Sequence, residues 1–313
     1  MEKKIRVRFI WFFDNKSVYH INFFKDLFAD RGFTMEVISD PNEICDIEFI
    51  NVHKPRSSKL KGLLERVVKN PIIGDEDSSL LYPDLYNPRT KNALNRAWFT
   101  MENVRPPAQS GLLVTLSYDQ NDFGGLNLYL PAWYLQVGLF NPVKLDYVGV
   151  ESNALNLTKP RSPVNNVNRK FACSIFRNAH AVRLLGINAL NGIAPVDLFG
   201  PIAGSWLESK FEVAKNYKFT VCFENDLYPG YVTEKLHEAY ITGTIPLYWG
   251  DLGNDNNINR KSFINMNDFE SMDAFVDYVR FIDNDTYAEI YQQPFLNNIP
   301  DVSSIQDRLL KVL

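Results

Sequence analysis

The 313-residue chain has few cysteines, no long apolar run and only a small excess of acidic over basic residues. Its three cysteines, Cys45, Cys173 and Cys222, are scattered through apolar segments, which argues against a disulfide framework or a cysteine metal site and indicates buried thiols in a reducing compartment. No apolar run reaches the roughly 18 residues that a transmembrane helix needs, and the N-terminus lacks the apolar core of a signal peptide. With 33 basic and 37 acidic residues, no nucleic-acid partner is expected. These absences predict a cytoplasmic protein.

Two glycine-rich phosphate-binding motifs are also missing. The chain contains neither Gly-x-Gly-x-x-Gly nor Gly-x-x-x-x-Gly-Lys-[Ser/Thr], which argues against a nicotinamide-dependent dehydrogenase and a P-loop nucleotide hydrolase. What is present is typical of a globular protein, with 45% apolar and 22% charged residues. The length fits two domains of about 150 residues each.

Both halves of the chain predict strands that alternate with helices, which is typical of α/β domains. Polar residues 159–168 are the best domain boundary in the sequence. We therefore expect an N-terminal Rossmann-like domain over residues 1–160, a C-terminal one over 161–300, and a C-terminal helix over 301–313 that is able to pack back on the first domain. Residues 59–69 predict a basic amphipathic helix, interpreted as a solvated outer face, and residues 70–92 show no clear period.

Residues 217–250 predict a β-α-β unit with parallel strands and a right-handed crossover. Thr233 is suited to cap its helix, and Gly243 to end it. Ligands of such sheets lie at the carboxyl ends of strands and the amino ends of helices. That junction carries a dense set of polar groups suited to a phosphate, namely Glu224, Asn225, Tyr231, Thr233, Glu234 and Lys235.

A second cation lies near another predicted helix start. Asn178 is suited to cap a helix that ends near residue 191, with Leu185 toward the core and Arg183 off the buried face. Arg183 and Lys235 could together neutralise a diphosphate without a metal. From spacing alone, a solvated surface role for either cation stays open.

Other polar residues have plainer interpretations. Asp119 and Asp122 lie in a glycine-containing loop with no histidine or third acid nearby, so solvated turn carboxylates are favoured over metal ligands. The four histidines are isolated from one another and are interpreted as surface or packing residues rather than ligands: His20, His53, His180 and His237.

Three stretches of the second half resemble the donor-binding motif of the α1,3/4-fucosyltransferases, particularly the bacterial type of glycosyltransferase family 10. They are Phe223-Glu224-Asn225, Tyr231-Val232-Thr233-Glu234-Lys235 and Ile245-Pro246-Leu247-Tyr248-Trp249-Gly250. Shorter similarities at residues 100–103, 118–123 and 178–183 extend the resemblance to both halves, and it is most specific across residues 170–266.

The resemblance implies a GT-B fold, in which two α/β Rossmann-like domains face each other across a cleft. It implies a glycan-biosynthetic enzyme, including protein glycosylation, that moves L-fucose with inversion from GDP-β-L-fucose to the 3-hydroxyl of a GlcNAc-type residue in a lactosamine-like oligosaccharide. No metal or other cofactor is expected. The N-terminal domain would bind the acceptor and the C-terminal domain the donor. The implied catalytic residues are Glu102, as general base, with Glu234, Arg183 and Lys235, and the implied donor-binding residues are Arg183, Asn225, Tyr231, Glu234 and Lys235.

Each implied role has a structural alternative. Glu102 could belong to a turn, Glu234 could be a first-turn acid favoured by the helix dipole, and Tyr231 could pack against Pro229. The chain also ends without the heptad repeats and basic tail of many bacterial relatives, so membrane tethering is not expected. A peripheral location at the inner membrane is expected only if such a tail has been removed.

Residues 126–131 lack the arginine that many relatives have before the proline, which affects acceptor recognition rather than donor chemistry. Two alternative functions remain open. One is a GT-B transferase that uses another nucleotide sugar, and the other is a catalytically inactive protein that binds a nucleotide sugar.

Overall fold

The computed structural model describes residues 3–10, 17–51, 92–106, 111–166, 168–204 and 207–313. It divides into two compact units, residues 1–129 with 302–313 and residues 130–301. The predicted basic helix at 59–69 and residues 70–91 lie outside the described residues. The two units divide at residue 130, whereas the sequence predicts a boundary near residue 160. The expected C-terminal helix belongs to the first unit.

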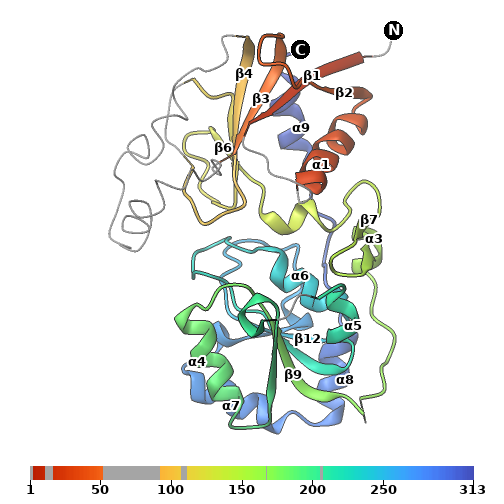
Figure 1. Cartoon of the computed structure of the whole chain (residues 1–313), viewed down its shortest axis with the longest axis vertical. Helices are drawn as coiled ribbons and strands as arrows, with labels where there is room; N and C mark the ends of the chain where they lie inside the picture. The colour runs from red at the N-terminus through yellow and green to blue at the C-terminus, as the bar shows by residue number, and fades with distance from the viewer. Residues whose placement is uncertain (1–2, 11–16, 52–91, 107–110, 167, 205–206) are drawn as a thin grey trace. The chain divides into compact units, whose positions relative to one another are not determined.

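The first unit is built on a six-stranded parallel sheet with the strand order β2-β1-β3-β4-β5-β6 (Figure 1). Its strands are β1 Lys3–Ile10, β2 Phe33–Val37, β3 Cys45–Asn51, β4 Ala93–Phe99, β5 Val114–Ser117 and β6 Asn127–Tyr129. Within the described residues of this unit, the helices are α1 Ser17–Ala29 and α9 Ser303–Leu310.

Aromatic packing holds α1 against this sheet. The ring of Phe24, on α1, lies 4.3 Å from that of Phe49 and 5.6 Å from that of Phe99, between ring centroids. Helix α9 is attached to α1 by Gln306, whose amide nitrogen donates to the main-chain oxygen of Leu27 at 3.0 Å and to the carboxylate of Asp30 at 2.8 Å. The end of the chain is therefore part of the first unit's core.

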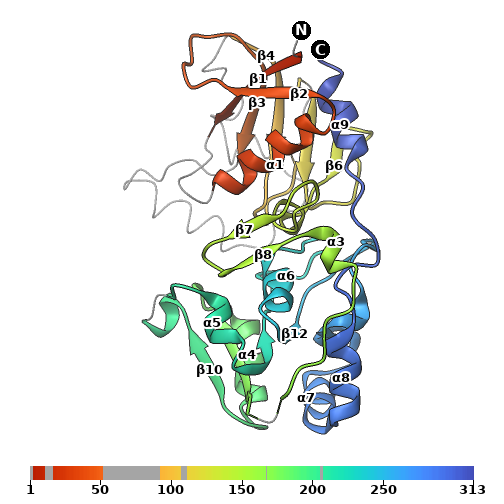
Figure 2. The same ribbon diagram turned by 90° about the vertical axis from the view of Figure 1, so that its right-hand side faces the viewer.

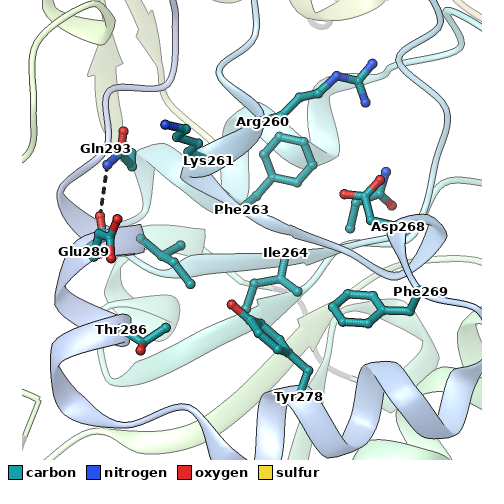
Figure 3. Close-up of a pocket in the computed structure, with 12 residues that line it drawn as sticks. Arg260, Lys261, Phe263, Ile264, Asp268, Phe269, Tyr278, Thr286, Glu289 and Gln293 are labelled. Atoms are coloured by element: carbon teal, nitrogen blue, oxygen red, sulfur yellow. Dashed lines mark hydrogen bonds between the residues drawn. The ribbon is translucent and has the colours of Figure 1, made fainter.

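The second unit is built on a five-stranded parallel sheet with the order β10-β9-β11-β12-β13 (Figure 2). Its strands are β9 Lys170–Ile175, β10 Val196–Phe199, β11 Tyr217–Val221, β12 Ile245–Tyr248 and β13 Ile264–Asn265, and its helices are α4 Ala181–Leu190, α5 Lys210–Ala214, α6 Glu234–Ile241, α7 Met272–Phe281 and α8 Asn284–Gln292. A pocket lies beside the edge strand β13 (Figure 3).

Smaller elements complete the second unit. They are the hairpin β7 Val143–Leu145 with β8 Val150–Ser152, helix α3 Ala154–Leu157, and short 3-10 helices at Ala132–Leu135, Pro201–Ala203, Arg260–Ser262 and Met266–Asp268. Two contacts join the hairpin region to α6. The hydroxyl of Tyr147 donates to Glu238, and the hydroxyl of Ser152 lies 2.9 Å from the Nε2 atom of His237.

Arg161 explains why the expected linker is not a boundary. Its guanidinium lies between the rings of Tyr240 and Tyr291, 4.0 and 3.9 Å from their centroids. It donates hydrogen bonds to the main-chain oxygens of both tyrosines and of Thr244. A guanidinium stacked on two rings and bonded to three carbonyls fixes the chain around Arg161 to the second unit.

The parallel sheets with their helices confirm the expected α/β class. All three cysteines, Cys45, Cys173 and Cys222, are free and buried, as the sequence predicts.

Candidate functional site

The predicted β-α-β unit is present at residues 217–250. Strands β11 and β12 pair in parallel, with Phe219 opposite Ile245. Helix α6 begins after Thr233, whose side chain accepts a hydrogen bond from the main chain of Lys235, so the predicted cap is confirmed. Gly243 follows the helix with a φ of 80°, a left-handed conformation that glycine adopts without strain.

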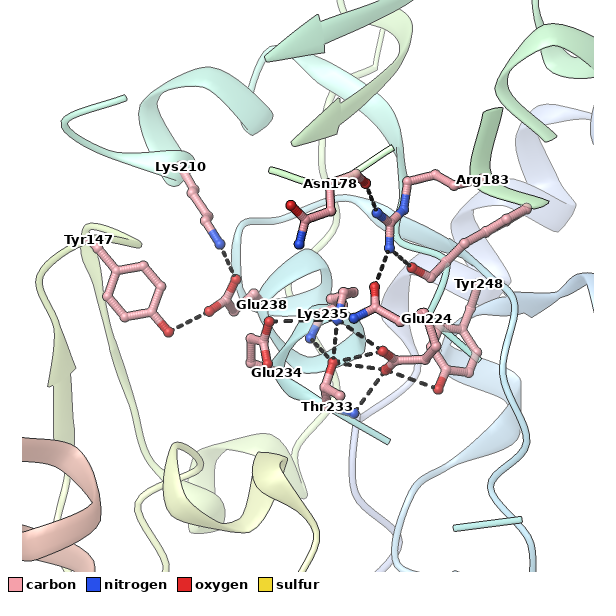
Figure 4. A network of polar contacts seen from close by, with 12 residues as sticks. Tyr147, Asn178, Arg183, Lys210, Glu224, Thr233, Glu234, Lys235, Glu238 and Tyr248 are labelled. Atoms are coloured by element: carbon pink, nitrogen blue, oxygen red, sulfur yellow. Dashed lines mark hydrogen bonds and ion pairs between the residues drawn. The ribbon is translucent and has the colours of Figure 1, made fainter. Parts of the chain in front are cut away.

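A buried carboxylate organises the amino end of α6 (Figure 4). Glu224 is 0% exposed. It accepts hydrogen bonds from the Thr233 main chain at 2.8 Å, the Thr233 hydroxyl at 2.8 Å, the Lys235 ammonium at 3.0 Å and the Tyr248 hydroxyl at 3.3 Å. Sequence reasoning places Glu224 at this junction without a role. The structure shows that it joins the end of β11 to the start of α6 and to the end of β12.

Lys235 is held as a cation with part of its side chain open to solvent. Burial favours the neutral amine, but the negative charges of Glu224 and Glu234 outweigh that effect and raise the pKa of Lys235 above its ordinary value. Its Nζ atom donates to Glu224 and, at 2.8 Å, to Thr233, while Glu234 lies 3.7 Å away. The side chain is 22% exposed. One of its three N–H groups can therefore meet a ligand.

Arg183 is buried, although the sequence predicts it off the buried face of its helix. The residue is 2% exposed, whereas Leu185, expected in the core, is 63% exposed. The guanidinium donates to the main-chain oxygens of Asn178 at 2.7 Å and Phe223 at 2.6 Å. These carbonyls replace water around the charge, which makes its burial tolerable. Burial lowers the pKa of Arg183, and the charge of Glu224 opposes that shift.

The start of α4 also differs from its prediction. His180 is the N-cap, without a side-chain hydrogen bond, so the helix begins two residues later than a cap at Asn178 would place it. Gly186 lets the helix approach β11, because a Cβ atom there would lie 2.3 Å from a ring carbon of Phe223. This close approach brings Arg183 to the end of β11.

Arg183 orients Asn225. It donates to the Oδ1 atom of Asn225 at 3.1 Å, so the amide nitrogen is left to donate elsewhere, and among the described residues it has no acceptor. Tyr231 is 2% exposed and lies in the loop before α6. The structure thus brings Arg183, Asn225, Glu234 and Lys235 to the carboxyl end of β11 and the amino end of α6.

Glu102 lies in the first unit, after the carboxyl end of β4. Its main-chain N–H donates to the Thr100 hydroxyl at 3.0 Å, and its main-chain oxygen accepts from Val104 at 2.7 Å. The segment is a turn with Glu102 exposed. The other predicted site residues all belong to the second unit.

Asp119 differs from the expected solvated carboxylate. It is 2% exposed, lies 3.3 Å from Arg105 and accepts a hydrogen bond from the main chain of Asn121. Asp122 is exposed and accepts from Gly124, as a turn residue does. Within the described ranges, no group of three histidine, cysteine or acidic residues could hold a metal ion. No helix in that part of the chain is both long and apolar enough to cross a membrane.

Residues 167–295 match the family model described as glycosyltransferase family 10 (fucosyltransferase), C-terminal. These residues are a family 10 glycosyltransferase domain. The match includes Arg183 and the Glu224 cluster, which is Glu224 with its hydrogen-bond partners Thr233, Lys235 and Tyr248. It confirms the resemblance that the motifs indicate. The alignment with alpha-(1,3)-fucosyltransferase FucT of Helicobacter pylori, at 30% identity over 312 residues, covers 92% of this chain and 58% of that relative.

A shorter similarity to alpha-(1,3)-fucosyltransferase B of Drosophila melanogaster has 38% identity over 90 residues, or 28% of this chain and 20% of that relative. The chain thus spans less than two thirds of the length of these relatives. A crystal structure of an α1,3-fucosyltransferase matches with a TM-score of 0.66 at 23% identity, covering 99% of this chain and 89% of that one. A complex with GDP-fucose matches at 0.67 and 21% identity, covering 100% and 91%. The shared fold confirms the expected GT-B class.

Proposed function

We propose that the chain is an inverting α1,3-fucosyltransferase that moves L-fucose from GDP-β-L-fucose to the 3-hydroxyl of a GlcNAc-type residue in a lactosamine-like glycan. The observation that carries the proposal is the cation of Lys235, held by Glu224 at the amino end of α6 within a family 10 domain. A helix amino end with a fixed cation is suited to the diphosphate of a nucleotide sugar.

The charges around α6 fit such a transfer. As the bond between C1 of fucose and the diphosphate oxygen breaks, its electron pair leaves with GDP, and the cations of Lys235 and Arg183 stabilise the added negative charge. Glu234, whose side chain is 36% exposed, favours the positive charge that develops on the fucose ring. Asn225 and Tyr231 would hold the ribose, the fucose or the diphosphate.

The acceptor hydroxyl loses its proton as its oxygen bonds to C1, and Glu102 is the proposed base. Its exposed position after a strand of the first unit supports this role. In this proposal the first unit binds the acceptor and the second binds the donor. A cytoplasmic location is part of the proposal and is supported by the three free thiols.

Transfer assays with a panel of donors test the proposal. GDP-fucose should support transfer to N-acetyllactosamine, and the product should carry an α1,3 linkage, whereas UDP-sugars and other GDP-sugars should not react. Transfer from another donor alone would establish the first alternative function, a different nucleotide-sugar transferase.

The Glu102→Gln variant tests whether the protein is an enzyme or an inactive protein that binds a nucleotide sugar. We expect this change to abolish turnover and to leave GDP affinity nearly unchanged, because the carboxylate acts on the acceptor. Glu36→Gln is the matched control, since Glu36 is an exposed carboxylate on β2 of the same unit. Binding of GDP-fucose without turnover in the unmodified protein would favour the second alternative.

A further inference from the structure

The pocket beside β13 shares no lining residue with the site around α6. It has a volume of about 350 Å³. Its floor contains Phe263 and Ile264, which are 5% and 4% exposed. The remaining lining comes from the 3-10 helix Arg260–Ser262, from Asn265 on β13, from the turn after that strand, and from α7, α8 and the residue that follows α8 (Figure 3).

Two aromatic rings form one side of this pocket. The rings of Phe269 and Tyr278 lie 5.2 Å apart between centroids, and Figure 3 shows them together next to Ile264. Tyr278 is 41% exposed, so part of its ring is open to a ligand. Phe263, which also lines the pocket, is fixed by an edge contact with Tyr248, whose ring centroid lies 5.6 Å away. The pocket thus has an aromatic surface whose rings are held in place by contacts with other aromatic rings.

The charges of the lining are balanced and largely unpaired. Arg260 and Lys261 contribute two cations, and Asp268 and Glu289 two carboxylates. Arg260 donates to the main-chain oxygen of Gly253 at 3.1 Å. Throughout the described part of the chain, the charged side-chain groups of Lys261, Asp268 and Glu289 make no ion pair or hydrogen bond, although the main-chain oxygen of Glu289 accepts a hydrogen bond from Gln293 (Figure 3). Their ammonium and carboxylate groups are available to a ligand.

This combination selects a class of ligand. A phosphate would meet the carboxylates of Asp268 and Glu289, and an organic cation would meet the charge of Lys261. A saccharide is neutral, its hydroxyl groups both donate and accept hydrogen bonds, and its C–H face packs on aromatic rings. We propose that the pocket is a second saccharide-binding site, which holds a neutral oligosaccharide independently of the donor.

Tyr248 connects this pocket with the Glu224 cluster. Its ring packs on Phe263, and its hydroxyl donates to Glu224. Asn265, on β13, donates to the main-chain oxygen of Gly250 at 3.0 Å, just after β12. If the proposed transfer is correct, the pocket retains a remote part of a long acceptor. That retention role rests on the proposed function, whereas saccharide binding does not.

Saturation-transfer NMR with a trimer of N-acetyllactosamine tests the site. Tyr278→Ala and Glu289→Gln should each weaken binding of the trimer by about tenfold. A loss of this size is expected when one stacking or charge-assisted contact is removed. Phe281→Ala is the matched control, because Phe281 is a 77% exposed ring on the same helix and does not line the pocket. It should bind the trimer like the unmodified protein. GDP affinity, measured by titration calorimetry, should stay the same in all variants.

Equal trimer affinities in the unmodified protein and both pocket variants would overturn the proposal. Displacement of the trimer by inorganic phosphate, in a manner that depends on Tyr278, would instead reveal an anion site and would also overturn it. Because Glu289 is exposed, Glu289→Gln keeps the test valid even if Tyr278→Ala fails to fold. Failure of the proposed function is recognised separately, as absent transfer to monomeric N-acetyllactosamine with intact trimer binding.

Discussion

Replacing Glu224 with glutamine tests how far the site depends on one buried charge. Glutamine keeps the shape of the side chain but removes its negative charge. Among the described residues, Lys235 then retains Glu234, at 3.7 Å, as its one ion-pair partner. Removing one partner from a buried ion pair costs about 3–5 kcal/mol of unfolding free energy. Because the Lys235 side chain is 22% exposed and water can screen its charge, we expect a loss of about 2–4 kcal/mol.

Urea unfolding at neutral pH measures this loss, and a double-mutant cycle assigns it to the pair. Lys235→Met removes the cation that Glu224→Gln leaves unpaired, so the double variant should be more stable than the two single losses predict, by at least about 1 kcal/mol. If the single losses add without coupling, the ion pair does not organise this site. The same conclusion would follow if Glu224→Gln unfolded within about 0.5 kcal/mol of the unmodified protein.

Three further predictions concern neighbouring groups. Lys235→Ala should weaken GDP binding by about 1.5–3 kcal/mol if its phosphate contact is charge-assisted, and equal affinity by calorimetry would exclude that contact. Burial lowers the pKa of His237 from 6.5 to about 3, so its neutral form stabilises the fold above pH 6.5. As the pH falls below that value, the unfolded chain takes up the proton first, and stability should decline by about 1.4 kcal/mol per pH unit. His237→Gln should remove this slope from pH-dependent unfolding curves, and an unchanged slope would contradict the assignment. Gly186→Ala should cost about 1–3 kcal/mol, because its new methyl group overlaps Phe223, whereas the exposed helix position Asn188→Ala should cost less than about 0.5 kcal/mol. Equal thermal stability of these two variants would refute the close packing of α4.

The β-α-β unit at residues 217–250 could be predicted from the sequence, and β11, α6 and β12 all lie within it. The hairpin β7–β8 and helix α3 were not predicted, because elements of three or four residues have no measurable period. Tertiary contacts such as that of Tyr147 with Glu238 fix these short elements.

The roles of site residues that are close in sequence could be predicted, but the contacts between residues that are distant in sequence could not. Thr233 and Lys235 are two positions apart in sequence, so a helix cap and a cation at the helix start follow from spacing. The burial of Arg183 depends on the carbonyl of Phe223, forty positions along the chain. The role of Glu224 likewise depends on Tyr248, which reaches it from the next strand. Contacts of this kind leave no pattern in a single sequence.

The position of α9 in the first unit has a consequence for synthesis of the chain. Residues 130–301 form a continuous compact unit, whereas the first unit needs residues 302–313 as well. Domains generally fold as units while the chain emerges from the ribosome. The second unit, although later in sequence, can therefore complete its fold before the first. Helix α1 of the first unit makes its hydrogen bond with Gln306 only after that residue has been synthesised. Truncation of the last residues should thus damage the beginning of the protein rather than its end.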